Sequence, residues 1–273
     1  MELNEQNLNS FLSSDRFALF DTHAHLTDEA FDFDRNALFS SFPYYGVRHV
    51  VEAACKETDF EKVLRLCDSY PDTVYGALGI HPEHADTYTV ETPAKIRSAL
   101  SPRIVAIGEI GLDYHYDDGC PKELQKKCFS EQIALSKELH LPVIIHDRDA
   151  HGDCMDILRS EKNGLRGVMH CFSGSYETAA ECLSLGLYIG VGGSSTFKNS
   201  RKLKEIIPKL PLDRILIETD CPYMTPEPFR GQRNDSRLCG LTLRRIAELR
   251  NENLETVAET CYANACSLFS VRD

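Results

Sequence analysis

The sequence lacks several features that would place it in other classes of protein. None of its apolar runs approaches the length of about 20 residues that a membrane-spanning helix requires. The opening segment, MELNEQNLNSFLSSDRF, has neither the basic start nor the apolar stretch of a secretory signal. Its eleven cysteines form no Cys-x-x-Cys pair, so we expect free thiols in a reducing compartment. We therefore expect a cytoplasmic protein that makes no contact with membranes.

The charge of the chain limits its partners further. A formal net charge of -12 argues against a general phosphate-binding surface. The one basic stretch, KNSRKLKEIIPK from Lys198, is better interpreted as a solvated helix face than as a nucleic-acid patch. Any contact with nucleic acid must then be local or supported by metal ions.

Short β-rich runs recur along the chain with helix-like segments between them. They are FALFDTH from Phe17, VRHVVEAAC from Val47, VYGALGI from Val74, RIVAIGEIGL from Arg103, LPVIIHD from Leu141, RGVMHCF from Arg166, GLYIGVGG from Gly186 and RILIETD from Arg214. Runs such as VIIH and ILIE are apolar on both faces, as parallel strands covered by helices are. The α/β pattern predicts a (β/α)8 TIM barrel, with a doubly wound open sheet as the alternative.

The chain shows no internal boundary. No repeat, low-complexity tract or linker rich in proline and glycine divides it. We therefore expect a single barrel domain over residues 1–273, in which residues 1–16 form a leader segment outside the core.

Side chains that bind metals occur at the carboxyl ends of these runs. His23 and His25 are two positions apart in FDTHAHL, so a strand would place both imidazoles on one face. A lone His-x-His pair is as often simple polar decoration, but four later runs end in the same way. Their terminal ligand types are Glu109, His146, His170 and Asp220. Because the carboxyl ends of barrel strands meet at one face, we expect these groups to surround one mouth.

The predicted ligands also indicate a type of chemistry. Four histidines and two carboxylates suit two divalent ions, which could be zinc, manganese or magnesium, with Glu109 able to span them. Metal ions can activate water for hydrolysis, and Asp220 is then the candidate general base. No serine nucleophile is required, since FSGS from Phe172 lacks the Gly-x-Ser-x-Gly elbow.

Candidate substrate contacts lie in the loops that follow the strands. His81 in GIHP could meet substrate or could stabilise the turn before Pro82. Phosphate donors could come from arginines and from the amides of the SGS segment that opens a helix. The residues nominated for this role are Arg148, Arg230, Arg233 and Ser173. Arg230 and Arg233 could equally form solvated ion pairs with Glu227 and Asp235.

Four further polar residues, Asp113, His115, Asp149 and His151, are expected to shape the mouth of the barrel without a catalytic role.

The sequence resembles the TatD family of metal-dependent hydrolases and deoxyribonucleases over residues 18 to 270. The resemblance rests on FDTHAHL, GIHPEHA, VAIGEIGLDYH, LPVIIHDRDAH, VMHCFSGS, YIGVGG, ILIETDCPYMTPEPFRGQRN and ANACSLF, and on the spacing of Gln125, Phe129 and Gln132. It implies an amidohydrolase-like barrel with a divalent-metal centre. In that pattern His23, His25 and Asp220 hold one ion, His146 and His170 hold the other, and Glu109 bridges them.

The resemblance implies a deoxyribonuclease that cleaves phosphodiester bonds at DNA ends or in single strands. Aminoacyl-tRNA deacylation and small-molecule amidohydrolysis remain alternatives because the same centre could attack an ester or an amide. A non-catalytic metal-binding module is disfavoured, since structural zinc sites are usually closed. The expected partner is a DNA substrate, with tRNA as the other option, and no obligatory protein partner is evident from the sequence.

Overall fold

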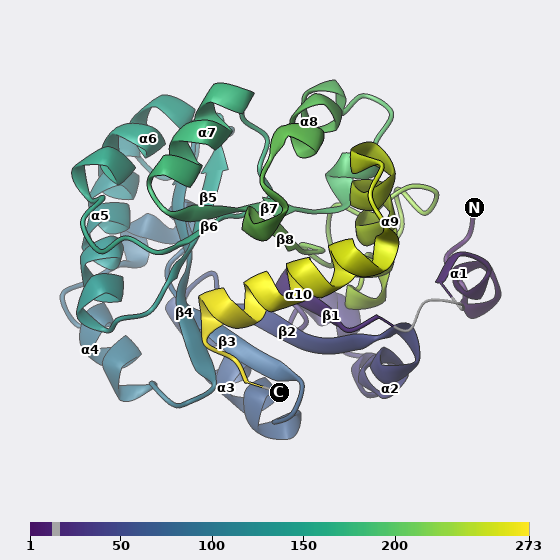
Figure 1. The fold of residues 1–273 in the computed structure, drawn as a ribbon. Coiled ribbons are helices and arrows are strands. Elements are labelled where there is room, and N and C mark those ends of the chain that lie inside the picture. The colour runs from purple at the N-terminus through teal and green to yellow at the C-terminus, as the bar shows by residue number, and fades with distance from the viewer. Residues whose placement is uncertain (13–16, 273) are drawn as a thin grey trace. The chain divides into compact units, whose positions relative to one another are not determined.

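The computed structural model describes residues 1–12 and 17–272, in which strands and helices alternate along the chain (Figure 1). The strands are β1 (Leu19–Ala24), β2 (Val47–Ala53), β3 (Val74–Leu78), β4 (Ile104–Asp113), β5 (Val143–Arg148), β6 (Gly167–Met169), β7 (Leu187–Val191) and β8 (Ile215–Ile217). The helices are α1 (Glu5–Leu12), α2 (Arg35–Ser41), α3 (Phe60–Ser69), α4 (Thr92–Ser98), α5 (Lys122–Glu138), α6 (His151–Ser160), α7 (Tyr176–Ser184), α8 (Arg201–Ile206), α9 (Cys239–Arg250) and α10 (Leu254–Phe269). Each β-rich run of the sequence contains one of these strands.

The strands form one sheet in sequence order from β1 to β8. The pairs from β3 to β7 are parallel. At the other end of the order, Ala24 and Cys221 form a parallel bridge, and the Thr22 hydroxyl donates to the Ile217 carbonyl at 3.1 Å. Sequential order with β8 beside β1 defines a (β/α)8 barrel, so the predicted fold class is confirmed and the doubly wound alternative is wrong.

The apolar strands are buried along their length. Val143, Ile144 and Ile145 are successive residues of β5, and their side chains alternate between the two faces of the strand. All three are fully buried, and so are the three residues of β8. This double-sided burial explains why these runs show no alternation of polar and apolar residues.

The chain divides into two compact units. Unit 1 comprises Met1–Val51 and Gly190–Ser267, and unit 2 comprises Glu52–Ile189 and Leu268–Asp273. Within unit 2, α5 packs along β4, the longest strand of the sheet (Figure 1). The expectation of a single domain over residues 1–273 stays a prediction.

The amino-terminal segment differs from the sequence-based expectation. Leu8 and Leu12 of α1 are buried in a cluster with Phe229 of unit 1. Leucines four residues apart lie on one face of a helix, and this face supplies the apolar contact. The prediction that the leader lies outside the core is therefore wrong for residues 1–12, whereas residues 13–16 lie outside the described residues.

The structure also bears on the sequence-based expectations about membrane spans, cysteines and the basic stretch. No helix within residues 1–12 and 17–272 combines the length and apolarity that a bilayer span needs. All eleven cysteines are free thiols. In the basic stretch, Arg201 and Lys202 of α8 are exposed while Leu203 is buried, as a solvated helix face requires.

Candidate metal centre

Three ligand-type side chains of unit 1 converge where β1 ends and where the chain leaves β8. The Nε2 atoms of His23 and His25 lie 3.1 Å apart, and each lies 3.7 Å from Oδ1 of Asp220. The His23 side chain is fully buried, while that of Asp220 keeps 17% of its surface exposed. The structure thus brings together the three residues that the sequence nominated from β1 and β8.

The main chain holds this cluster in place. The Asp220 N–H donates to the His23 carbonyl at 2.9 Å, and the His25 N–H donates to the Cys221 carbonyl at 2.8 Å. Asp220 itself has a left-handed backbone with a φ of 59°. This conformation costs a non-glycine residue about 1–2 kcal/mol, and the hydrogen bonds on either side of it offset that cost.

A buried carboxylate braces the same turn. Asp21 of β1 accepts the Thr219 N–H at Oδ1 (2.9 Å) and the Thr219 hydroxyl at Oδ2 (2.6 Å). Burial raises the pKa of Asp21 to about 7, although hydrogen bonds from Thr219 and Ser236 act in the opposite direction. Asp21 shares the strand face of His23, but its oxygens bind the residue that precedes Asp220.

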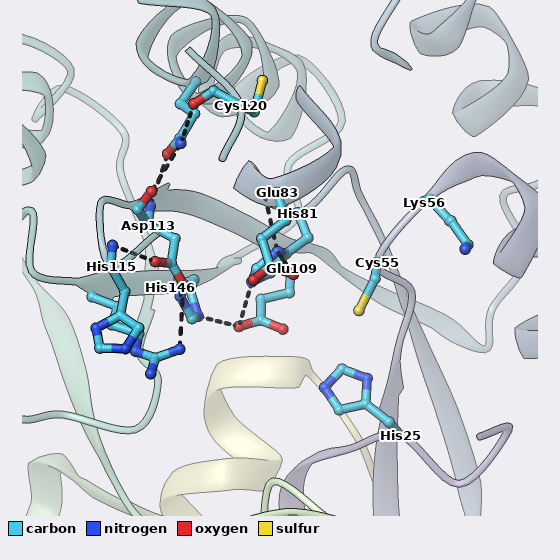
Figure 2. Close-up of polar contacts among 12 residues, drawn as sticks. His25, Cys55, Lys56, His81, Glu83, Glu109, Asp113, His115, Cys120 and His146 are labelled. Atoms are coloured by element: carbon cyan, nitrogen blue, oxygen red, sulfur yellow. Dashed lines mark hydrogen bonds and ion pairs between the residues drawn. The ribbon is translucent and has the colours of Figure 1, made fainter. Parts of the chain in front are cut away.

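A second ligand-type cluster lies in unit 2 (Figure 2). Oε1 of Glu109 in β4 lies 2.7 Å from Nδ1 of His146 in β5. The same oxygen lies 3.4 Å from Nε2 of His170, which follows β6. Oδ2 of Asp113, at the end of β4, lies 2.9 Å from the other ring nitrogen of His146. Glu109, His170 and Asp113 are all buried. The cluster therefore unites the ligand types nominated from β4, β5 and β6.

Glycine at position 111 permits the close approach of β4 and β5 at this cluster. Gly111 pairs with His146 in the strand register and has a φ of 148°. A Cβ atom there would lie 2.0 Å from the His146 carbonyl oxygen. Because only glycine avoids this overlap, Gly111 helps to set the backbone of His146 beside Glu109.

The electrostatics of unit 2 favour a positive charge between the carboxylates. Burial lowers the pKa of His146, but its hydrogen bonds to Asp113 and Glu109 outweigh this effect and raise the pKa to about 10. Burial raises the pKa of Asp113, but hydrogen bonds from His146 and from the His115 N–H lower it overall. The cluster thus stabilises a cation at the point where predicted ligands meet.

Both clusters fit divalent ions by the chemistry of their donors. In unit 1, two imidazole nitrogens of the same type face each other beside a carboxylate, an arrangement that a shared cation satisfies. In unit 2, a carboxylate oxygen lies between two imidazole nitrogens. Imidazole and carboxylate ligands suit zinc and manganese, and no thiolate is needed in either set.

Of the two roles that the sequence left open for His81, the structure shows that of stabilising its turn. Its Nδ1 accepts the Glu83 N–H at 3.2 Å and caps the 3-10 helix at Pro82–Thr87. The same ring lies 4.4 Å from the His146 ring, and Nε2 lies 3.9 Å from Oε1 of Glu109. His81 therefore stabilises its turn and faces the ligand cluster of unit 2.

The candidate phosphate donors of unit 2 have different surroundings. The Arg148 guanidinium lies 4.0 Å from Asp113 and 5.3 Å from the centre of the Tyr116 ring, and its side chain is 44% exposed. Ser173 is exposed in the loop before α7, but Ser175 is the residue that caps the helix, by accepting the Thr178 N–H. Arg148 thus lies beside the unit 2 cluster.

The arginines of the loop after β8 differ in how they are bound. Arg233 donates to both oxygens of Asp34 at 2.7 and 2.6 Å and to the Ala30 carbonyl. Arg230 is exposed and packs its guanidinium over the Phe197 ring. Arg233 is therefore engaged in a structural ion pair, and its carboxylate partner is Asp34.

Sequence reasoning missed the residues that hold the ligands. The sequence pattern assigns no role to Asp21 and predicts only that Asp113 shapes the mouth of the barrel. Both had the same signal, because Asp21 lies two positions from His23 and Asp113 lies four positions from Glu109 on one strand face.

Comparison with known proteins agrees with this geometry. Residues 20–270 match the family described as TatD related DNase. The chain is 42% identical to the uncharacterized metal-dependent hydrolase YabD of Bacillus subtilis, over 93% of this chain and 99% of the relative. It is 33% identical to the 3'-5' ssDNA/RNA exonuclease TatD of Erwinia tasmaniensis, over 93% of this chain and all of the relative.

A solved structure supports the same relationship. The crystal structure of YjjV, a TatD homologue from Escherichia coli, superposes with a TM-score of 0.87 at 34% identity, covering 93% of this chain and 98% of the other. An amidohydrolase from Saccharomyces cerevisiae, at 20% identity and a TM-score of 0.77, shares the fold. By sequence and by fold, the chain belongs to the TatD family of metal-dependent hydrolases.

Proposed function

We propose that the protein is a metal-dependent nuclease that cleaves phosphodiester bonds of DNA from the ends of single strands. The observation that carries the proposal is that imidazole and carboxylate groups gather in each of the two units, in unit 1 where β1 and β8 end and in unit 2 on β4, on β5 and directly after β6. The Erwinia tasmaniensis relative, whose name states a 3'-5' exonuclease activity on ssDNA and RNA, supports the choice of substrate.

The two clusters would divide the metal ligands between them. His23, His25 and Asp220 would hold one ion in unit 1, and His146 and His170 would hold the other in unit 2. Glu109 lies with the unit 2 ligands, and its role as a bridge remains a sequence-based prediction. When bound, divalent ions supply a water of lowered pKa and neutralise charge on a phosphate. Zinc, manganese and magnesium are the candidate ions.

Asp220 is the candidate general base. Oδ1 of its carboxylate lies 3.7 Å from Nε2 of each imidazole, and the group is the most exposed member of the unit 1 cluster. Its backbone is fixed by the hydrogen bond to His23 and by the turn to Tyr223. A carboxylate held in this way can accept the proton of an attacking water without moving.

Substrate contacts would come from the loops around the clusters. Arg148 and Arg230 are exposed guanidinium groups suited to phosphate, and Ser173 adds a hydroxyl in unit 2. Because Nδ1 of His81 accepts a backbone N–H, its Nε2 carries the proton and can donate to a phosphate oxygen. Arg233 would support the loop through Asp34. We also propose that the enzyme acts in the cytoplasm.

A substrate panel with metal reconstitution tests the proposal. The purified protein is stripped of metal, reconstituted with Zn²⁺, Mn²⁺ or Mg²⁺, and assayed on 3'-labelled single-stranded DNA and on aminoacyl-tRNA. We expect release of nucleotides that depends on the added ion and is lost in Asp220→Asn. The control variant Arg97→Gln removes an exposed ion pair with Glu138 and should behave as wild type.

The same panel identifies the outcome that overturns the proposal. Release of amino acid from tRNA without release of nucleotides would favour the deacylase alternative. Metal binding without activity on either nucleic acid would favour a small-molecule amide or ester as substrate.

A further inference from the structure

Asp113 is a buried carboxylate at the end of β4 that the mechanism above does not use. Its Oδ1 accepts the His115 N–H at 2.9 Å, and its Oδ2 lies 2.9 Å from Nε2 of His146 (Figure 2). Only 6% of the residue is exposed. Each carboxylate oxygen therefore has a defined partner in unit 2.

The partners of His146 determine which nitrogen can bind a metal. Nδ1 faces Oε1 of Glu109 at 2.7 Å, and that oxygen also lies 3.4 Å from Nε2 of His170. The predicted ligands are therefore on the Nδ1 side of the ring, and Asp113 is on the Nε2 side. A ligating imidazole usually donates its other N–H to a carboxylate or carbonyl, which fixes the tautomer and the orientation of the ring.

Helix α5 fixes Asp113 through a buried glutamine. Oε1 of Gln125 accepts the Asp113 N–H at 2.8 Å, and its Nε2 donates to the Asp113 carbonyl at 2.8 Å. The same amide nitrogen donates to the Cys120 carbonyl (Figure 2). One side chain thus satisfies both main-chain groups of the residue that contacts His146.

The same helix contains a matched pair for comparison. Gln132, seven residues later on the same face of α5, binds the N–H and the carbonyl of Ile80 at 2.8 and 3.0 Å. Gln125 and Gln132 are both buried. The two glutamines make the same type of double hydrogen bond, but Gln125 holds the residue whose carboxylate contacts His146, whereas Gln132 holds Ile80.

We propose that Asp113 is a positioning residue that accepts the Nε2 proton of His146 and so presents Nδ1 to the metal, and that Gln125 holds Asp113 in this position. The inference rests on the proposed metal centre. It assigns Gln125 and Asp113 the function of orienting the His146 ring, and neither of these two residues contacts the ion itself.

Asp113→Asn is the first test of this arrangement. An amide in place of the carboxylate can donate to Nε2 and stabilise the tautomer with a proton on Nδ1, which cannot bind an ion. Loss of a carboxylate partner of a metal-bound histidine typically costs 10- to 100-fold in metal affinity. We expect the affinity for one of the bound Co²⁺ ions to fall by about this factor, measured by calorimetry and by visible absorption of the titrated apoprotein.

The glutamine pair supplies the matched control. Gln125→Met and Gln132→Met each replace a buried carboxamide by an apolar side chain of similar size. Both variants should therefore lower the melting temperature by similar amounts. We expect only Gln125→Met to weaken Co²⁺ binding. Equal Co²⁺ affinity in wild type and Asp113→Asn, or an equal loss in the two glutamine variants, would overturn the inference.

The state of the two His146 ring nitrogens can also be measured in the wild-type protein. Long-range ¹H–¹⁵N correlation spectra of the Zn²⁺-loaded protein distinguish a metal-bound nitrogen from a protonated one. We expect Nδ1 of His146 to be metal-bound and Nε2 to be protonated. Zinc on Nε2 would instead place an ion among His81, Asp113 and His146, and would overturn the inference while leaving the proposed nuclease function intact. Failure of the wild type to bind any divalent ion would overturn both.

Discussion

The two ligand clusters are held in different ways. In unit 1 the main chains of β1 and of the turn after β8 bond directly to each other, and one buried carboxylate, Asp21, braces the turn. In unit 2, β4 and β5 pair through their main chains, and side chains add a further support: Gln125 binds the main chain of Asp113, whose carboxylate contacts His146. The support in unit 1 depends on backbone conformation and on the charge of Asp21. The support in unit 2 depends on the chemical identity of the Gln125 and Asp113 side chains. The clusters should therefore respond differently to mutation and to pH.

The largest expected effect comes from removing one ligand from each cluster. Asp220→Asn in unit 1 and His146→Ala in unit 2 should each lower kcat by about 10³-fold or more, because ligand and proton-transfer groups are lost. Ion content measured by mass spectrometry should fall in both variants. Circular dichroism should show an intact fold. Full activity in either variant would remove that residue from the site.

Asp21 should make unit 1 sensitive to pH in the metal-free protein. Its pKa is about 7 in the folded chain, against an ordinary value of 3.8 for aspartate, so the folded state binds more protons between these values. Stability from this group is present below about pH 4 and is lost as the pH rises through 7, by up to about 4 kcal/mol.

Urea unfolding of wild type and Asp21→Asn from pH 4 to pH 8 isolates this contribution. As the pH rises, the free energy of unfolding of the wild type should fall relative to that of Asp21→Asn. A difference that stays constant over this range would show that Asp21 does not titrate within it.

Because α1 is packed through buried leucines, truncation of one of them should destabilise unit 1. Leu8→Ala removes a fully buried side chain and should lower the free energy of unfolding by about 2–4 kcal/mol. The control Leu124→Ala lies at an exposed position of α5 in unit 2 and should cost less than about 0.5 kcal/mol. Similar costs for the two variants would contradict the packing of α1.

The smallest effects should separate the two arginines of the loop after β8. Arg233→Lys breaks the two-point pair with Asp34 and should cost about 1 kcal/mol of stability with little change in KM. Arg230→Ala should leave stability unchanged and raise KM for single-stranded DNA about threefold, since a rim charge of this kind contributes up to about 1 kcal/mol. The reverse pattern would exchange their assigned roles.

Much of the fold and of the ligand clusters was predictable from sequence. Strands buried on both faces are continuous apolar runs, and ligand types at their carboxyl ends follow from parallel order. The positions of predicted ligands such as His23 and Glu109 therefore follow directly from the sequence pattern.

The supporting contacts were not predictable in the same way. The bond from Gln125 to Asp113 depends on how α5 packs on β4, which no local pattern encodes. The pair of Arg233 with Asp34 joins residues 199 positions apart. The burial of α1 did have a signal, since Leu8 and Leu12 share a helix face, but a short polar segment at a terminus more often remains unpacked.

The docking of α1 has a practical consequence for work on substrate choice. Phe11 packs edge-on against Phe229 at 5.9 Å, and the Gln232 side chain donates to the Met1 carbonyl, so α1 contacts the loop that carries Arg230. A purification tag fused ahead of Met1 would begin beside this loop, because Gln232 of the loop binds the Met1 carbonyl. Tags at the opposite terminus, or none, are the sounder design for comparing nucleic-acid substrates.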